Sequence, residues 1–516
     1  MNIKKIDFIK TDSKKINPKI IDCLFSILLF LYSLRHTRYG VEWWDTGYSY
    51  ANFLFIEHMD PMWKFSTFLA NVFGHLFTKL PFGDRMIGMN FYTGLIVTAM
   101  AIGGYFFFAK KLGIPKGIAF LGEMIALSLS WCPTAVLYNY LTYLFFGVAL
   151  VCIYEALTVS ERPRRKRLFL ILAGALLGIN IFVRFPNLVQ MGLILALWGY
   201  GWITKKKKKE VLFETLWCII GYLAGIALCL TVISLRYGFF EYIDAIVRLM
   251  NMPSEASAYT PMSMIMGQIR TYLQNLRWLS YPAMLAAFGT LLFTCLPKRL
   301  RKVFYLPYVG IVFLLFWYLA RRSMYNFNYL SLASMLQWAF FLLTLLILIG
   351  VRTLFHKKEN TSVKLMVLLA LLFVFITPIG TNNHLIASIN NLYFVAPFLL
   401  WLYIRAFGPL PASLGRWSLF PIKSTLACIF VMIFIQVGLC GWVYVFQEAT
   451  GGENLHTRVE NNDILRGMLT TPDRADVISS LTSYVTQEDL KGKEIILYGM
   501  IPALSYYLEM PFAISP

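Results

Sequence analysis

A short stretch that carries a carboxylate among aromatic residues follows the first apolar run of the chain. The run covers residues 23–34, and the stretch reads EWWDTGY at residues 42–48. A carboxylate this close to a membrane-spanning segment is costly to keep without a function. We therefore interpret Asp45 as the working group of a membrane enzyme, a general base that takes a proton from a hydroxyl group.

The same stretch allows a second interpretation. Trp43, Trp44 and Tyr48 have side chains that favour the interface between lipid and water, and Asp45 would then be solvated at a helix start. In the enzymatic interpretation, Trp44 and Tyr48 instead offer ring faces to a sugar or an acceptor. The stretch alone favours neither interpretation, so the rest of the chain must decide.

Arginines at the ends of apolar runs are the second group of candidates. They are Arg85, Arg184, Arg321 and Arg322. By the topology given below they lie on the outer side of the membrane, where basic residues are unusual. Guanidinium groups that converge on one cavity would form a phosphate clamp, because their fork geometry matches phosphate oxygens. We assign this role to Arg85, Arg184 and Arg321, and pairing with a lipid headgroup or a local carboxylate is the alternative, favoured for Arg322.

Further polar residues on the outer side extend the predicted site. Asp84 opens the second apolar run, where a role at a helix start is the alternative. Pro186 breaks a helix at membrane depth next to Arg184, and irregular backbone there is tolerated mainly beside a cavity. Asn383 and His384 add an amide and an imidazole, although a lone histidine is more often structural. We predict that Asp84, Asn383 and His384 contact the sugar or the acceptor.

Other titratable residues receive no chemistry. Glu123 and Glu155 fall near the cytoplasmic ends of spans, where basic neighbours explain them. The lysine run at 205–209 is interpreted as a solvated cytoplasmic turn. The eight cysteines lack the paired spacing of a metal or redox site.

Composition predicts a polytopic membrane protein. Of the 516 residues, 58% are hydrophobic and only 14% are charged, which differs strongly from a soluble globular domain. The net charge of +20 comes from short basic clusters between apolar runs. This pattern describes membrane topology and does not indicate nucleic-acid binding.

Apolar runs of about 20 residues predict about thirteen transmembrane helices in an all-α fold. The predicted spans are 20–36, 87–109, 117–135, 140–158, 168–184, 188–203, 211–235, 278–296, 303–320, 331–350, 365–380, 392–407 and 425–446. Alternate connections carry the basic clusters, which places them and the N-terminus in the cytoplasm and the C-terminus outside. We expect a plasma-membrane protein whose Asp45 faces outward.

The outer connections predict two domains. The transmembrane domain covers residues 1–446 and includes a long first outer loop at 37–86, where 61–80 has the spacing of an amphipathic interfacial helix. The loop at 237–277 is either a second interfacial piece or a flap. Residues 447–516 predict a small extracytoplasmic α/β segment with a helix from Arg474, a strand at 493–498 and a helix at 502–509.

An outward carboxylate, outward arginines and many aromatic residues suit one reaction. A sugar on a polyprenyl phosphate keeps its tail in the bilayer and presents its phosphate at headgroup depth. Transfer to an extracytoplasmic acceptor needs a general base and cations that stabilise the departing phosphate. Asp45 fits the base, and the arginines fit the cations.

At these positions the chain resembles the GT-C superfamily of membrane glycosyltransferases, which includes protein O-mannosyltransferases and the lipid A aminoarabinose transferase. The resemblance rests on Asp45 after the first span, the amphipathic stretch 61–80, the Asp84-Arg85 pair and the outward tail. It implies a polyprenyl-phosphate sugar donor, inversion at the sugar, and Asp45 as the base. Many relatives have Asp-Glu where this chain has Asp45-Thr46. Some branches use a divalent metal, and we expect none here.

Two other functions are alternatives to a transferase. A transporter or flippase of lipid-linked saccharides would place ionisable groups at mid-bilayer in broken helices. A catalytically silent membrane protein for envelope assembly would tolerate the loss of Asp45.

Overall fold

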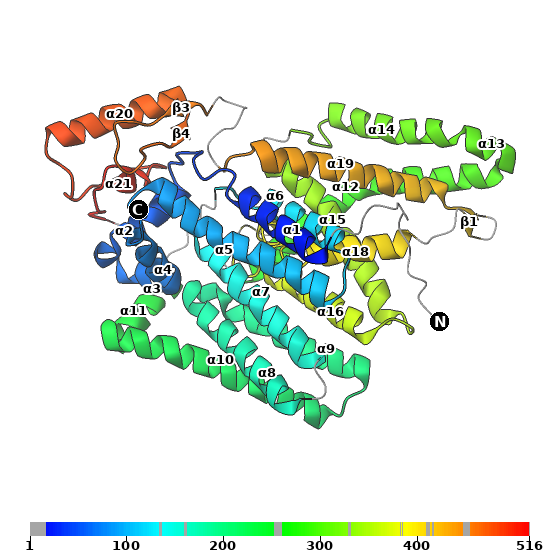
Figure 1. The fold of residues 1–516 in the computed structure, drawn as a ribbon, viewed down its shortest axis with the longest axis horizontal. Coiled ribbons are helices and arrows are strands. Elements are labelled where there is room, and N and C mark those ends of the chain that lie inside the picture. Colours follow the sequence, from blue (N-terminus) through cyan, green and yellow to red (C-terminus); the bar gives the residue numbers. More distant parts are fainter. Residues whose placement is uncertain are drawn as a thin grey trace.

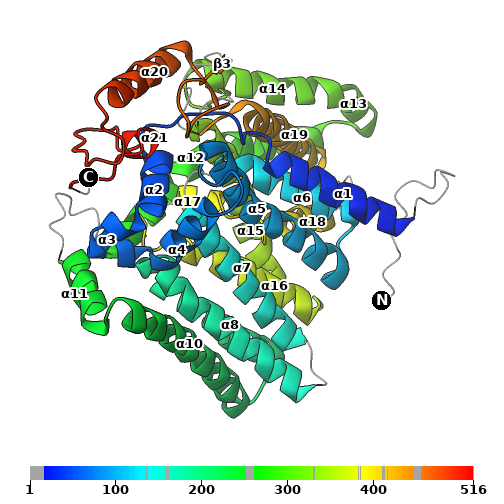
Figure 2. The same ribbon diagram turned by 60° about the vertical axis from the view of Figure 1, so that its left-hand side comes forward.

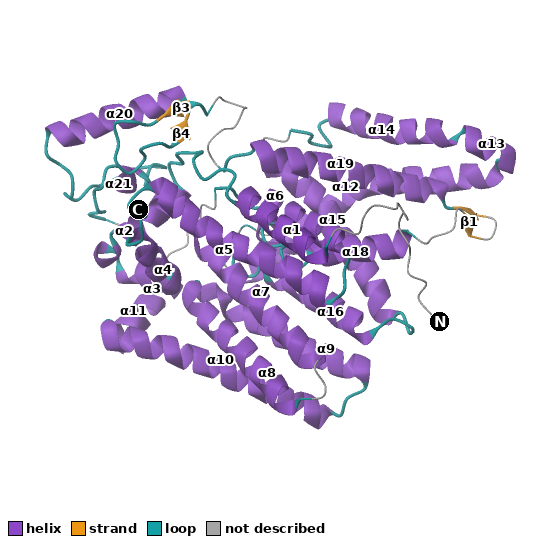
Figure 3. Cartoon of the chain, viewed as in Figure 1, coloured by secondary structure: helices purple, strands orange, loops and turns teal. Residues whose placement is uncertain are grey.

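The computed structural model shows a chain whose regular secondary structure is almost entirely α-helix (Figures 1 and 3). It describes residues 17–133, 137–158, 162–251, 261–328, 332–381, 383, 385–408, 413–414, 417–446 and 455–514. The long helices form one bundle, and the C-terminal tail lies beside α2 at one end of it (Figure 1). We call this end the tail end.

The elements have the following bounds. The first half contains α1 (Pro18–Ser33), α2 (Asp45–Leu54), η1 (Ile56–His58), α3 (Pro61–Ser66), α4 (Phe68–Thr78), α5 (Met86–Phe106), η2 (Phe107–Lys111), α6 (Lys116–Leu129), α7 (Leu137–Thr158), α8 (Pro163–Val183), η3 (Phe185–Ile194), α9 (Leu195–Thr204) and α10 (Lys208–Arg236). The second half contains α11 (Phe239–Met250), α12 (Pro261–Cys295), α13 (Lys298–Val303), α14 (Tyr305–Arg321), α15 (Leu332–Phe355), α16 (Thr361–Ile376), α17 (Leu385–Ile389), α18 (Ala396–Phe407), α19 (Phe420–Val443), α20 (Pro472–Gln487) and α21 (Leu504–Tyr507). Two antiparallel pairs of two-residue strands complete the described fold: β1 (Ser413–Leu414) with β2 (Trp417–Ser418), and β3 (Thr457–Arg458) with β4 (Leu469–Thr470).

Seven helices in the described part of the chain are long and apolar enough to cross a membrane. They are Met86–Lys111, Leu137–Thr158, Pro163–Val183, Lys208–Arg236, Ile265–Cys295, Ser334–Phe355 and Phe420–Val443. This confirms the prediction of an all-α membrane protein. The other six predicted spans also contain helix, but these helices are shorter, such as α1 with 16 residues and α18 with 12. Thirteen crossings therefore stay a prediction.

Helices α8 and α10 pack closely because each carries two glycines four residues apart. The pairs are Gly174 with Gly178 on α8, and Gly221 with Gly225 on α10. A Cβ on Gly174 would lie 1.9 Å from the carbonyl oxygen of Cys218, and one on Gly221 would lie 2.0 Å from that of Ile171. Small residues at this spacing let two membrane helices approach backbone to backbone. A side chain at any of these positions would push the helices apart.

The segment at 37–86, which we call the first loop, and the C-terminal tail share one hydrophobic core. Tyr50 and Phe53 of α2, Met86 of α5, and Ile478 of α20 are all buried in it. Backbone hydrogen bonds join the same segments, since the amide of Leu469 donates to the carbonyl of Arg38 at 2.8 Å and Met86 donates to Ile464 at 2.9 Å. The tail is therefore packed onto the first loop rather than separate from it.

The predicted amphipathic helix at 61–80 is present as two pieces. α3 ends at Ser66, Thr67 separates the two helices, and α4 begins at Phe68. Helix α11, at the start of the loop 237–277, packs against α3 (Figure 2). The ring of Tyr242 on α11 lies 5.5 Å from that of Phe65, edge to face. These helices form the base of the tail end.

The tail differs from the prediction in its strands. The predicted strand at 493–498 is wrong, because in this stretch only Ile495 forms a bridge, to Phe512, and no strand is present. The predicted helix at 502–509 is shorter and covers Leu504–Tyr507. The helix expected from Arg474 begins two residues earlier, at Pro472. The tail needs no extended sheet, because its apolar residues are buried in the core that it shares with α2.

Candidate functional site

Glu42 fixes the start of α2. Its carboxylate accepts hydrogen bonds from the backbone amides of Trp44 and Thr46, both at 2.6 Å. These amides belong to the helix N-terminus, where the backbone has no partners of its own and favours negative charge. The residue is only 4% exposed, and the hydroxyl of Tyr507 in α21 donates to its carbonyl oxygen. Sequence reasoning assigned Glu42 no role, because glutamate two residues before an N-cap is not among the usual capping residues.

Asp45 is the first residue of α2. It is partly exposed, and no side chain or backbone group among the described residues forms a hydrogen bond or ion pair with its carboxylate. Burial, followed by the charge of Glu42, raises the pKa of Asp45 to about 6. The second interpretation correctly placed Asp45 at a helix start, but Glu42, three residues earlier, provides the cap. Asp45 is left without a structural partner.

The tail closes over one side of the Asp45 segment. The amide of Ala503 donates to the carbonyl of Trp43 at 3.0 Å. A Cβ on Gly47 would lie 2.2 Å from the Cβ of Ala503, so only glycine allows this approach. Trp44 is 47% exposed beside this contact. Aromatic surface and a carboxylate are thus presented together at the tail end.

A cavity of about 440 Å³ lies further along α2. It is lined by Ala51, Asn52, Phe55, His58, Met59, Asp60, Met62, Trp63, Phe512, Ala513 and Ile514. Asp45, Tyr48 and Asn52 follow each other at helical spacing, which places them along one face of α2. The ring of Tyr48 lies 5.8 Å from that of Phe512, a residue of the cavity wall. Asp45 does not line the cavity itself but stands on the same helix face, two turns away.

Arg85 and Asp84 lie at the start of α5, beside the shared core. Arg85 is partly exposed and directly precedes the helix, while Asp84 is exposed. No hydrogen bond or ion pair of the described residues joins either side chain to Asp45. Their assigned roles stay predictions.

Arg184 and the segment around Asn383 meet, as expected from their shared side. The guanidinium of Arg184 donates to the carbonyl of Gly380 at 2.8 Å and lies 5.5 Å from the ring centre of Tyr138. Asn383 is exposed, and its backbone amide donates to the hydroxyl of Thr381 at 3.1 Å. His384 lies outside the described residues.

Arg321 lies on a different helix from the other candidates. It is exposed at the end of α14, and its guanidinium lies 5.3 Å from the ring centre of Trp317, one turn earlier. The contact lies within α14 and makes no link to α2. Convergence of Arg85, Arg184 and Arg321 on one phosphate therefore stays a prediction.

The helix break before Pro186 is closed by an amide network that the sequence analysis missed. α8 ends at Val183, and the chain continues as the 3₁₀ segment η3. The side-chain amide of Asn187 donates to the hydroxyl of Thr142 at 2.8 Å, and that of Asn180 donates to Gln190 at 2.6 Å. All four side chains are buried. Three amide residues at 180, 187 and 190 in an apolar stretch were the available signal.

The sequence analysis predicts that Glu123 and Glu155 pair with basic neighbours, and the structure shows this for only one of them. Glu155 forms an ion pair with Lys111 at 2.7 Å, as predicted. The prediction for Glu123 is wrong, because it is fully buried and neither carboxylate oxygen has a partner among the described residues. The nearest preceding lysine on its helix, Lys116, pairs instead with Asp22 at 2.6 Å. Glu123 is two turns further into the bundle, about 10 Å along the helix axis.

The described residues contain no group of three or more histidine, cysteine, aspartate or glutamate side chains that could hold a metal ion. The arrangement at the tail end thus offers a carboxylate, aromatic faces and a cavity. These groups can accept a proton and hold a polar ligand.

Comparison with protein-family models, with curated proteins and with solved structures finds no match to this chain. The fold and its apolar helices define the class as an α-helical membrane protein.

Proposed function

We propose that the protein is a membrane glycosyltransferase that moves a sugar from a polyprenyl phosphate to an extracytoplasmic acceptor. The observation that carries the proposal is the Asp45 carboxylate, which has no structural partner and has a pKa of about 6. A base with this pKa is charged at neutral pH and still basic enough to accept a proton from a hydroxyl group. The resemblance of the first loop to the GT-C superfamily points to the same residue.

The surroundings of Asp45 suit a lipid-bound donor and a sugar. Trp44 is exposed beside the carboxylate, and the cavity along α2 adds Trp63, Asn52 and Asp60. Aromatic faces with a few placed polar groups are typical of sites for polar small molecules. In this proposal Asp45 takes the proton of the acceptor hydroxyl as the new glycosidic bond forms. The bond from the sugar to the phosphate breaks, and the phosphate leaves on the polyprenyl chain with its charge held by Arg85 and Arg184.

The first experiment compares Asp45→Asn with Asp476→Asn. The purified proteins are reconstituted in lipid vesicles with radiolabelled synthetic polyprenyl-phosphate sugars and a bacterial envelope extract as acceptor. Because general-base catalysis contributes about 10² to 10⁴ in rate, we expect Asp45→Asn to lose transfer by that factor. Asp476 is an exposed carboxylate on α20, so its variant controls for charge at the tail end. Equal transfer by both variants would contradict the proposal.

A second function is favoured by a separate observation. Glu123 is a buried carboxyl in α6 with no partner among the described residues, and α8 is broken at Arg184. Buried ionisable groups and broken helices are typical of transporters. A flippase of lipid-linked saccharides would depend on Glu123 and not on Asp45. Lipid-flipping assays on Asp45→Asn and Glu123→Gln therefore separate the two functions.

A further inference from the structure

A second cavity, of about 620 Å³, lies at the other end of α10 from α11. It is lined by Trp198, Gly201, Trp202, Ile203, Lys205, Lys206, Lys208, Val211, Leu354, Phe355, Lys357 and Lys364. Its wall thus has five lysines and no acidic residue. The elements that meet there are α9, the start of α10, the end of α15 and the start of α16. We call it the lysine cavity.

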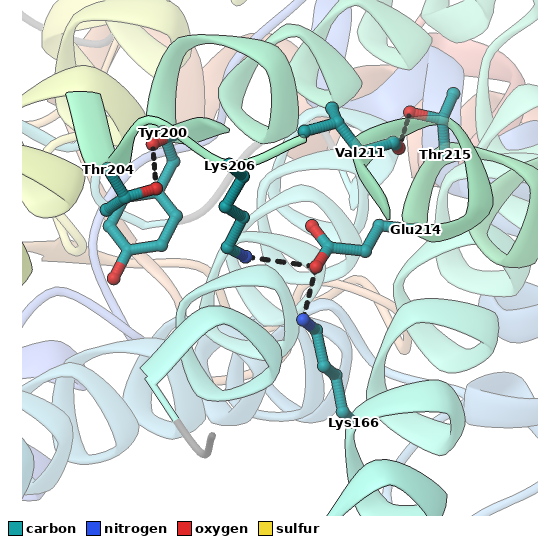
Figure 4. Close-up of polar contacts among 7 residues, drawn as sticks. All are labelled: Lys166, Tyr200, Thr204, Lys206, Val211, Glu214 and Thr215. Carbon is teal, nitrogen blue, oxygen red and sulfur yellow. Dashed lines mark hydrogen bonds and ion pairs between the residues drawn. The ribbon is translucent and has the colours of Figure 1, made fainter. Parts of the chain in front are cut away.

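One lysine of the cavity is already neutralised. Lys206 lies 3.0 Å from an oxygen of Glu214, and Lys166 of α8 pairs with the same oxygen. Figure 4 shows the two lysine side chains reaching Glu214 from different segments. The glutamate is buried, and its other oxygen has no partner among the described residues. Glu214 has one negative charge and already pairs with two lysines, so it does not neutralise the other lysines of the cavity.

Four lysines of the wall have no ion pair or hydrogen bond from their ammonium groups within the described chain. They are Lys205, Lys208, Lys357 and Lys364. Lys364 is the most enclosed of the four, because the residue as a whole is only 9% exposed, although its ammonium nitrogen is not among the buried polar atoms that lack a partner. A lysine at an apolar surface usually buries its aliphatic stem and keeps its ammonium group accessible. Its position on the cavity wall leaves this ammonium group available to an anion in the cavity.

The backbone at Lys205 has the conformation of a helix C-terminus. This residue ends α9 in the left-handed conformation, with φ of 55°. Glycine is the usual residue at such a helix end, because a side chain is strained there. A lysine at this position places an ammonium group at the cavity at the cost of local strain.

The cavity also has an exposed apolar side. Trp202 and Phe355 are 71% and 69% exposed, and Trp198 is 42% exposed. Exposed tryptophans are typical of the boundary between the acyl chains and the headgroups of a bilayer. Ammonium groups above an aromatic surface match an anionic headgroup that is attached to acyl chains.

The place of the cavity fits a headgroup layer. α10 has 29 residues and is therefore about 43 Å long, which exceeds a hydrocarbon core of about 30 Å. Lys208 begins this helix, and α11 follows its other end and packs on α3. The lysine cavity and the tail end are thus separated by the length of a membrane-spanning helix.

We propose that the lysine cavity binds the phosphate headgroup of an anionic glycerophospholipid. Lys364 and Lys205 contact the phosphate, Lys208 and Lys357 add long-range attraction, and the acyl chains lie along Trp202 and Phe355. Basic pockets between membrane helices bind anionic lipids in this way. The lysine run at 205–209 is then not merely a solvated turn, as its sequence suggested.

The test measures lipid binding to the purified full-length protein by native mass spectrometry in detergent. The two probes are phosphatidylglycerol and phosphatidylcholine, which differ in net headgroup charge. We expect the wild type to prefer phosphatidylglycerol by at least about tenfold. Lys364→Met keeps the length of the side chain and removes the charge, so we expect about a fivefold loss of that preference.

The control is Lys209→Met. Lys209 belongs to the same lysine run but is exposed and does not line the cavity. Equal preference in both variants, or no preference in the wild type, would overturn the proposal. A double variant, Lys208→Met with Lys357→Met, affects only exposed lysines of the wall and gives the same test if Lys364→Met does not fold. Competition by millimolar inorganic phosphate as effective as the lipid would overturn the assignment to a lipid.

Discussion

Glu42 and Glu214 are both buried glutamates near the start of a helix, at opposite ends of the molecule, and they are neutralised differently. Glu42 at the tail end receives two backbone amides, which leaves Asp45 as a free acid. Glu214 receives two lysine side chains, which leaves other lysines of the cavity as free cations. At each end, one buried glutamate forms contacts within the protein. The charged groups without a partner, Asp45 at one end and the lysines of the cavity at the other, are available to a ligand of opposite or complementary character. The tail end is suited to accept a proton, and the lysine end is suited to hold an anion.

The largest effect on stability is expected from Glu42→Gln. Glutamine has the same shape, but it is neutral and can accept from only one of the two amides. Charged hydrogen bonds contribute about 1.5 to 3 kcal/mol each, so we expect a loss of about 2 to 3 kcal/mol. The measurement is the melting temperature of the purified protein in detergent, together with proteolysis of the tail. A Glu42→Gln protein as stable as the wild type would show that Glu42 does not fix α2.

Asp45→Asn is the matched comparison three residues away. The substitution breaks no hydrogen bond of the described residues, because the Asp45 carboxylate forms none. It removes a partly buried negative charge next to Glu42. We expect the melting temperature at pH 7 to stay equal or rise. A marked fall would mean that Asp45 is a structural residue, as its helix-start position alone suggests.

The next largest effect is expected on activity, as a dependence of the transfer rate on pH. Protonated Asp45 cannot accept a proton, so transfer should fall about tenfold per pH unit below pH 6 and level off above pH 7. The measurement is kcat/KM for label transfer between pH 4.5 and 8. A flat profile across pH 6 would exclude Asp45 as the base.

The same pKa has a consequence for stability that does not depend on catalysis. The pKa of Asp45 is raised from 3.8 to about 6 on folding, so the folded chain binds this proton more tightly than the unfolded chain does. Its contribution therefore favours folding at pH 4 and is lost as the pH rises to about 6. This part of the pH dependence should disappear in Asp45→Asn, measured as melting temperature against pH.

A smaller effect is expected from Glu214→Gln. Lys166 and Lys206 have side chains that are 24% and 20% exposed, so both can turn toward water or headgroups when their partner is lost. We expect a loss of about 1 kcal/mol, less than for Glu42→Gln. The freed Lys206 should also raise the preference for phosphatidylglycerol severalfold in the lipid-binding measurement. Destabilisation as large as that of Glu42→Gln would remove the contrast between the two ends.

The sequence predicted the elements better than their contacts. Apolar runs gave the long helices, and aromatic periodicity at 61–80 gave α3 and α4, because helical spacing is a local property. Contacts between distant segments left no such pattern. The bond from Leu469 to Arg38 joins residues far apart in the chain, so the packing of the tail on the first loop could not be predicted.

Some site features were present in the sequence but were not recognised. The glycine pairs on α8 and α10 have the spacing that indicates close helix packing. The lysine run looked like a solvated turn because Lys364, which makes the cavity charged on its inner wall, lies on another helix. A charge cluster becomes a site only when the fold adds residues from elsewhere.

The smallest effect is expected from Glu123→Gln, and it tests the transferase against the transporter. Neither oxygen of Glu123 has a partner to lose, and glutamine removes the cost of a buried acid without changing the shape. We therefore expect an equal or higher melting temperature and transfer within about twofold of the wild type. Its control is Glu155→Gln, which loses the ion pair to Lys111. If Glu123→Gln folds normally but abolishes lipid flipping or transfer, the buried acid has a function of its own, and the division of roles between the two ends would no longer account for the activity.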